Sequence, residues 1–285
     1  MKFNTKKFVI ILASIVFVSF LLSGILFYAT GGIKPSLIAS EQIKTNESFG
    51  VEGVEKIVIN AVSPKIKILP AEGKDIVVDF YGSITTNLGE KAPKLVADIN
   101  NNILNISISY PKTFILGLFD ISNIFLDIYL PAQFTKEINA TSVSGDINIE
   151  DFNGTKIQLK TTSGNISANS IKAIEIQTDS ISGNINFKKV EGNLKIISVS
   201  GDVSAGLASL ADDILIKTTS GEAKLTLPLS SSFIFDLESI SGNMKNNFDS
   251  TIKSASERSM QGNVGDGLNT IKITTVSGGI TIIKE

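Results

Sequence analysis

Serine is the residue whose spacing in this chain most invites a chemical interpretation. A serine nucleophile needs a neighbouring base, most often His. The 285 residues include no His and no Cys, and nothing singles out a lysine for that role. We therefore predict that the regularly spaced serines are not catalytic. Seven of them directly precede a glycine, at intervals of 19, 19, 18, 20, 21 and 36 residues: Ser144, Ser163, Ser182, Ser200, Ser220, Ser241 and Ser277.

The position after six of these glycines could instead hold a cation, because it carries an acid or an amide. Calcium-binding β-repeats space their carboxylates within a short Gly-rich nonapeptide. Only three of the six residues here are acidic, and no such nonapeptide is present. Asp and Asn also favour tight turns, which explains the column without a metal. We predict turn formers and no metal or other cofactor at these positions: Asp146, Asn165, Asn184, Asp202, Glu222 and Asn243.

Other activities have equally little support in the composition. Glycoside cleavage usually needs two positioned carboxylates, and the acids here are scattered. Residues 1–34 hold four lysines and no acid, so the remainder is net acidic, and Arg258 is the only arginine. Nucleic-acid binding depends on clustered Lys and Arg. We therefore predict neither an enzyme nor a nucleic-acid-binding protein, and we assign no catalytic, cofactor-binding or metal-binding residue.

The elements around each Ser-Gly pair read as strand, corner, strand and turn. Ile157 and Leu159 precede one pair in alternation, and Asn153-Gly154 marks a second turn. Glycine allows a positive φ at the corner. Two strands and two turns in about 19 residues fit either a hairpin meander or the coil of a solenoid. Identical residues in one column favour stacked coils, in which we expect the Ser182 hydroxyl and its equivalents to be buried as a ladder.

The predicted fold class is therefore all-β: a β-solenoid (β-helix-like) of about 19-residue, two-strand coils, preceded by one transmembrane helix. Residues 136–285 form the regular Ser-Gly repeats, and residues 51–135 form degenerate coils that cap them, with Pro64 where a corner glycine would stand. We expect a loop and one degenerate unit over 245–269. The apolar segment 113–126 packs in the core or caps it; alternatively it is exposed and meets the bilayer or a partner.

The N-terminus predicts membrane attachment. Residues 8–28 carry no charge and are long enough to span a bilayer as a helix. Three lysines precede this anchor, so the tail, residues 1–7, should be cytoplasmic and the repeats extracytoplasmic. A cleaved signal peptide is the alternative, although its apolar core is usually shorter. The polar residues 34–50 then read as a linker between the cell membrane and the β domain.

The repeat pattern [Ser/Thr]-x-Ser-Gly-[Asp/Asn]-[Ile/Val] resembles the bacterial putative-adhesin family, domain-of-unknown-function family 4097. Residues 128–131 and 270–278 are similar to that family's lead-in and ending, and the resemblance is strong from Phe125 on. It implies a β-solenoid envelope domain without catalytic residues. We expect a non-catalytic binding, adhesin-like or scaffolding module whose partner is an envelope polymer or a membrane protein. The alternatives are an envelope-stress sensor acting through a membrane partner and, less well supported, a glycan-active enzyme.

Overall fold

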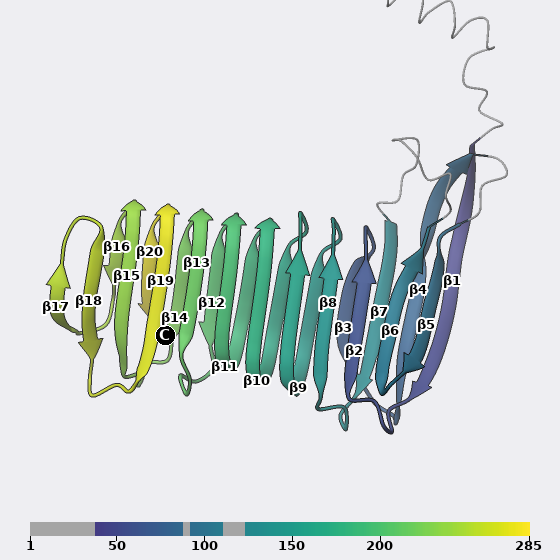
Figure 1. Cartoon of the computed structure of the whole chain (residues 1–285), viewed down its shortest axis with the longest axis horizontal. Helices are drawn as coiled ribbons and strands as arrows, with labels where there is room; N and C mark the ends of the chain where they lie inside the picture. The colour runs from purple at the N-terminus through teal and green to yellow at the C-terminus, as the bar shows by residue number, and fades with distance from the viewer. Residues whose placement is uncertain (1–37, 88–91, 111–122) are drawn as a thin grey trace, which may run out of the picture.

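The computed structural model of the chain describes residues 38–87, 92–110 and 123–285. All regular structure in these ranges is β, with 20 strands joined in one continuous sheet (Figure 1). The expected all-β class is thus confirmed. No helix in the described ranges could cross a membrane. The predicted tail, residues 1–7, and anchor, residues 8–28, lie outside them.

Successive repeats stack as parallel coils. Ile147, Ile166 and Ile185 are aligned on three neighbouring strands, one repeat apart. A meander would have paired strands antiparallel within each repeat, so these registers match coils and exclude hairpins here. The strands that carry this part of the stack are β8 (Glu137–Ser142), β9 (Ile147–Thr161), β10 (Ile166–Ser182) and β11 (Ile185–Ser200).

The coils form two layers with the core between them. The halves of β9, β10 and β11 before the second turn belong to one layer, and the halves after it belong to the other. Apolar side chains alternate inward along each half, so one strand supplies both sides of the core, as Ile147 and Ile157 do. Most of the core side chains are almost fully buried, in one continuous cluster from Ile43 to Ile282.

Strand order in the C-terminal half differs from sequence order. The strands here are β12 (Val203–Leu207), β13 (Ile214–Ser220), β14 (Ala223–Leu227), β15 (Phe233–Ser241), β16 (Met244–Asn246), β19 (Asn269–Ser277) and β20 (Ile280–Lys284). β19 lies between β13 and β15, and β20 lies between β14 and β16. The last coil in sequence is therefore inserted between two earlier ones (Figure 1).

The 36-residue interval is occupied by a hairpin. β17 (Thr251–Ala255) and β18 (Ser259–Val264) pair antiparallel, and β18 pairs antiparallel with β15. The expected degenerate coil over 245–269 was wrong, because the chain turns back along β15 and does not wind round the core. The hairpin covers one end of the stack.

The N-terminal end repeats the same design with a different order. Its strands are β1 (Ile38–Gly50), β2 (Lys56–Ala61), β3 (Lys65–Ala71), β4 (Asp75–Asn87), β5 (Lys94–Asn100), β6 (Ile103–Ser109) and β7 (Asn123–Pro131). The β2–β3 coil lies between β6–β7 on one side and β8–β9 on the other. β5 pairs antiparallel with β6, and β4 with β7, so this end is also covered.

One local expectation needs correction here, and a second falls only partly within the described ranges. Residues 38–50 of the predicted linker form β1, which pairs with β4 along its whole length. Of the apolar segment, residues 123–126 begin β7 and bury Ile124 and Leu126, whereas residues 113–122 lie outside the described ranges. Pro64 stands at a coil corner, directly beside Gly145.

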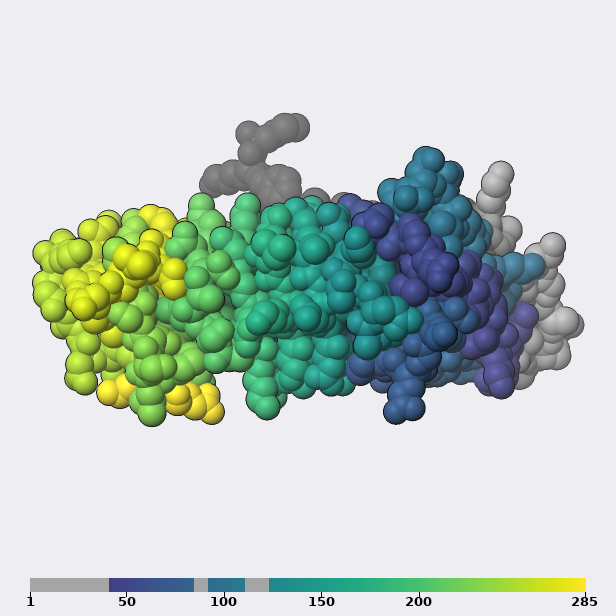
Figure 2. Space-filling view, turned by 90° about the horizontal axis from the view of Figure 1, so that it is seen from below, coloured from purple at the N-terminus to yellow at the C-terminus, as the bar shows by residue number. Residues whose placement is uncertain are grey.

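We call the two sides of the stack the first and the second layer. The first layer runs β5, β6, β2, β8, the later halves of β9 to β11, β13, β19, β15, β18 and β17. The second layer runs β1, β4, β7, β3, the earlier halves of β9 to β11, β12, β14, β20 and β16. Figure 2 shows the resulting elongated body.

Candidate binding surface

The serine column lies on the outside of the corner. Ser182 and its six equivalents are exposed, so the expected buried ladder was wrong. The hydroxyl residues buried at the corner stand two positions earlier, because the chain bends between the two and turns the later one outward. They are Ser142, Thr161, Ser180, Ser198, Thr218, Ser239 and Thr275. The exposed residues still connect coils through the backbone, as the Ser182 amide does by donating to the Thr162 carbonyl at 2.8 Å.

The corner glycines are fixed by the close stacking of the coils. A Cβ on Gly183 would overlap the carbonyl oxygen of Gly164, and the same clash recurs at each corner glycine. Gly183, Gly201, Gly221 and Gly278 also have φ between 116° and 144°, a region that L side chains disfavour. The sequence-based expectation of positive φ therefore holds at four of the seven corners, whereas the steric need holds at all seven.

The Asp/Asn column forms a ladder of hydrogen bonds along the corner. The backbone amide of Asn165 donates to Asp146 Oδ1, and the backbone amide of Asn184 donates to Asn165 Oδ1, both at 2.9 Å. In the same way the backbone amide of Asp202 donates to Asn184 Oδ1, and that of Glu222 donates to Asp202 Oδ1. Each side-chain oxygen thus accepts from a corner N–H that the bend removes from the sheet ladder. This role needs no cation.

No group of three or more acids within the described residues is arranged to hold a metal ion. Asp146 and Asp202 point along the stack at backbone amides, and neither converges on a second carboxylate. The sequence predicts no catalytic or metal-binding residue, so no such residues are expected to lie together. What the fold does bring together is side chains in rows across the coils.

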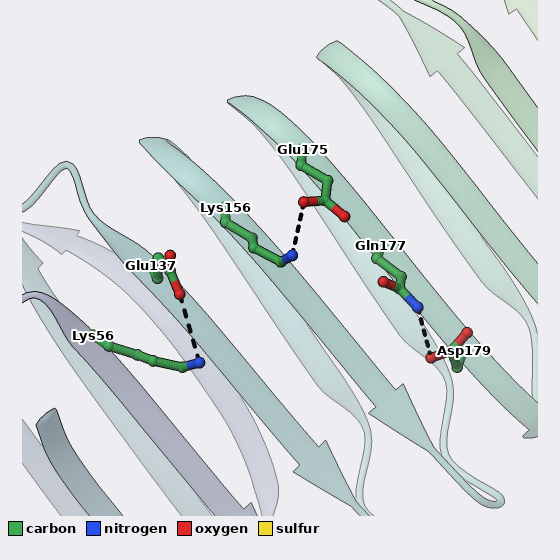
Figure 3. A network of polar contacts seen from close by, with 6 residues as sticks. All are labelled: Lys56, Glu137, Lys156, Glu175, Gln177 and Asp179. Carbon is green, nitrogen blue, oxygen red and sulfur yellow. Dashed lines mark hydrogen bonds and ion pairs between the residues drawn. The ribbon is translucent and has the colours of Figure 1, made fainter.

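The outer face of the first layer carries rows of ion pairs. Lys56 and Glu137 are aligned on neighbouring strands, and their charged groups are 3.5 Å apart (Figure 3). The next two coils repeat the arrangement with Lys156 and Glu175, at 2.7 Å. The hydrogen bond from its ammonium to Glu175 raises the pKa of Lys156. Sequence reasoning missed these rows, although the alternation of Lys and acid at one repeat position was a usable signal.

A second row on this layer continues the pattern nearer the corner. Lys160 lies 3.3 Å from Asp179. Gln177 donates to the same carboxylate, as Figure 3 shows. Farther along, the ammonium of Lys272 is 2.6 Å from Asp236. Burial raises the pKa of Asp236, but hydrogen bonds from Lys272 and Gln261 outweigh it and lower the pKa overall. The rows therefore carry many charges that neutralise one another.

An apolar ridge runs beside these rows along the corner. It occupies the variable position of the [Ser/Thr]-x-Ser-Gly pattern and its counterpart in the β2–β3 coil. Every ridge residue is β-branched, and the Val and Ile members are 45–59% exposed. Threonine in two coils does not interrupt the line of branched side chains. The ridge consists, in spatial order, of Val62, Val143, Thr162, Ile181, Val199, Thr219, Val276 and Ile240.

The second layer holds one buried acid near its N-terminal end. Asp127 is 4% exposed and accepts a hydrogen bond from the Tyr81 hydroxyl at 2.9 Å. Its Oδ1 has no hydrogen-bond partner among the described residues. Burial raises the pKa of Asp127, although Tyr81 and Lys67 act in the opposite direction. Burial, with the hydrogen bond to Asp127, raises the pKa of Tyr81 to about 12.

Comparison with known proteins gives one family match and several similar folds. The family model described as Toastrack DUF4097 matches residues 54–191 and 133–283. A putative cell adhesion protein from Clostridium sporogenes is 15% identical, with a TM-score of 0.43 over 86% of this chain and 100% of its own. A putative adhesin from Bacteroides fragilis is 14% identical, with a TM-score of 0.45 over 85% and 97%. No curated protein sequence matches the chain.

Proposed function

The chain belongs to the Toastrack DUF4097 family, and from that premise we propose that it is a non-catalytic binding module of the bacterial cell envelope. One observation carries the proposal: the outer face of the first layer presents a regular array of paired charges beside the apolar ridge. The array is held on stacked strands that pair in parallel from coil to coil. Such a surface binds by repetition and rigidity, without reacting groups.

The charges of this surface favour a polar and nearly neutral partner. Lys56, Lys156 and Lys160 each have an acid within 3.5 Å, so the rows offer hydrogen-bonding groups without a strong net field. The ridge adds a narrow apolar line at the spacing of the coils, about 4.8 Å. An envelope polymer or the extracytoplasmic face of a membrane protein has this combination of repeating polar groups and small apolar faces.

We also propose that residues 8–28 anchor the module in the cell membrane, with the N-terminus in the cytoplasm. The support is the uncharged apolar run and the lysines before it. Protease added to intact protoplasts should then digest the β domain. Complete protection of the domain, or release of a soluble form that starts near Gly31, would reject the anchor.

The ridge supplies the test of the binding proposal. The full chain, purified in detergent, is applied to immobilised envelope polymers and to envelope membrane extracts. Ile181→Lys and Val199→Lys place charges in the ridge and should weaken retention, because a partner on the ridge would have to bury a lysine. Both side chains are exposed, so the melting temperature should not change.

Val96→Lys is the matched control. Val96 lies on β5, away from the ridge, and is 46% exposed against 48% for Val199. It should retain wild-type binding. If all three variants are retained as well as the wild type, the ridge has no part in the proposed function. If all three lose retention equally, the added net charge is the cause.

A further inference from the structure

The outer face of the second layer contains a hollow of about 470 Å³ where β11, β12 and β14 meet. Asn186, Ser204 and Thr226 line it from three neighbouring strands. Lys188 and Lys189 stand at the β11 edge, and Glu285 stands at the opposite edge, beyond β14. This hollow is separate from the rows and the ridge, which belong to the first layer.

The hollow arises because one coil lacks a bulge that its predecessors have. Asp151, Ser170 and Lys189 occupy the same place in three successive coils, all with left-handed φ between 47° and 55°. The next coil omits this residue, so Lys188 and Lys189 together face one residue of β12, Gly206. A bulged strand beside an unbulged one leaves a step in the sheet surface.

Gly206 is not required by the fold. Its φ is not in the left-handed region, and a Cβ there would meet the Phe187 carbonyl oxygen at 3.6 Å and the Lys188 Cα at 3.9 Å. Both distances are ordinary van der Waals contacts, in contrast to the clash at Gly183. Thr226, its partner on β14, does carry a side chain. A glycine in a strand costs stability, and here its effect is to leave the hollow open.

The groups around the hollow have a definite polarity. Lys188 and Lys189 are exposed, and neither forms an ion pair with a described residue. The amide of Asn186 and the hydroxyls of Ser204 and Thr226 can each donate and accept hydrogen bonds. Glu285 makes the far edge acidic. A ligand with a negative group at one end and hydroxyl groups along its length matches this order.

We propose that the hollow is a subsite for one acidic saccharide unit of an envelope polymer, an inference that rests on the proposed binding function. The carboxylate of the sugar lies at Lys188 and Lys189, away from Glu285. Its hydroxyls bond to Asn186, Ser204 and Thr226, and the ring covers the bare backbone at Gly206. The hollow on the second layer would thereby select a charged sugar, whereas the outer face of the first layer is nearly neutral.

The test uses trigalacturonate as the probe, titrated calorimetrically into the full chain in detergent, with neutral galactotriose in parallel. The wild type should bind trigalacturonate more tightly, and the difference should shrink as salt screens the lysines. Gly206→Val should fold at least as well as the wild type, because valine suits a strand, but it should lose binding because its side chain occupies the floor of the hollow where the ring would lie. Lys188→Gln should weaken trigalacturonate about fivefold and leave galactotriose unchanged.

Two controls keep the result specific. Asn169→Val places the same branched side chain on β10, next to Lys188 but outside the hollow. Lys195→Gln removes a charge from the first layer. Both should bind trigalacturonate as the wild type does.

Unchanged binding by a normally melting Gly206→Val would overturn the proposal. So would failure of the wild type to prefer trigalacturonate up to millimolar concentrations. If retention on envelope material still depends on the ridge in that case, the subsite fails while the proposed function stands.

Discussion

At the corner, Gly183 must carry a hydrogen where other residues carry a Cβ. The side of Gly183 that would carry a Cβ faces the carbonyl oxygen of Gly164, because the coils approach within hydrogen-bonding distance at the bend. Ser182, one residue earlier, points to solvent and has room for change. Two neighbouring residues of one motif therefore differ in whether they tolerate substitution, because one faces the adjacent coil and the other faces solvent.

Gly183→Val should destabilise the protein severely, by about 3 kcal/mol or more, because it combines overpacking against backbone with a disfavoured φ. Ser182→Ala should change the free energy of unfolding by less than about 0.5 kcal/mol. Urea titrations of both variants measure this. A tolerated valine would show that the coils can separate locally, and a costly Ser182→Ala would mean that its hydroxyl has a partner.

The buried Asp127 should make stability depend on pH. Its folded pKa is raised by burial, so the folded state favours the protonated form more than the unfolded state does. Stability from this group is then present below the ordinary carboxyl pKa and lost as pH rises through the raised value. The titratable groups that face it are Tyr81 and Asp79 on β4, Lys67 on β3 and Tyr129 on β7.

Asp127→Asn should therefore raise the free energy of unfolding near neutral pH, by about 1 kcal/mol, since a neutral amide avoids the buried charge. The gain should vanish at about pH 3, below the ordinary carboxyl pKa, where the wild-type carboxyl is protonated. Urea titrations at about pH 3 and about pH 7.5 give the comparison. A loss of stability at both values would mean that the ionised form is the one the fold requires.

At the scale of elements, the inserted β19–β20 coil changes which residues are terminal. In sequence order Gly278 belongs to the last coil, which would have one neighbour. In the structure this coil is paired on both sides, and a Cβ on Gly278 would overlap the carbonyl oxygen of Gly221. The outermost coil is that of β15 and β16, which comes earlier in the chain.

Gly278→Val should consequently cost as much as Gly183→Val, about 3 kcal/mol or more. If the stack followed the sequence, the cost at Gly278 would be clearly smaller. Parallel urea titrations of the two variants separate these cases, with Gly206→Val as a glycine substitution that the fold accepts.

The elements also show what local sequence can predict. The repeats, corners and core faces follow from short patterns, such as Leu194 and Ile196 before a Ser-Gly pair, because period-two burial and turn chemistry are local. The pairing of β1 with β4 and the insertion of β19 are choices between distant strands of similar pattern, which no local signal distinguishes. Burial at Ser180 in place of Ser182 was missed because identity within a column does not show which side of the corner the side chain faces.

For the surface, the sequence shows which types of residue are present but not how they are arranged in space. The absence of any imidazole or thiol predicts that the chain lacks His- or Cys-dependent catalysis, and this stays a prediction. The ridge at Ile181 and Val199 is visible only when the exposed side of the corner is known. The hollow at Gly206 depends on a missing residue in one coil, and a one-residue difference in repeat length does not by itself indicate a cavity.

At the scale of the whole molecule, antiparallel strands cover the ends of the stack. β4 and β5 cover one end, and the β17–β18 hairpin covers the first layer at the other. On the second layer β16 is only three residues long, which limits the exposed edge. The end-to-end association that an open parallel stack would permit is thereby opposed.

Deleting residues 249–266 and closing the gap with a short Gly-Ser linker should expose the edge of β15 and promote association of the chain. Light scattering on the full chain in detergent should show larger particles that grow with protein concentration. The wild type and Val96→Lys should not grow in this way. A deletion variant that stays at the size of the wild type would mean that the short β16 edge is protection enough.

The inserted C-terminal coil also constrains the order in which the protein can be completed. Residues Leu194 and Ile214 pair across 20 positions, whereas Ile214 and Ile271 pair across 57, and Ile271 then completes the contact with Phe235. During synthesis the β15–β16 coil therefore emerges before the strands on which it rests. Winding can proceed from β8 to β14 as the chain appears, but the β15–β16 coil must then wait until β19 and β20 have been made. The segment from β15 to β20 thus completes its pairing late, and proteases or chaperones that act on unfolded chains have that interval in which to act.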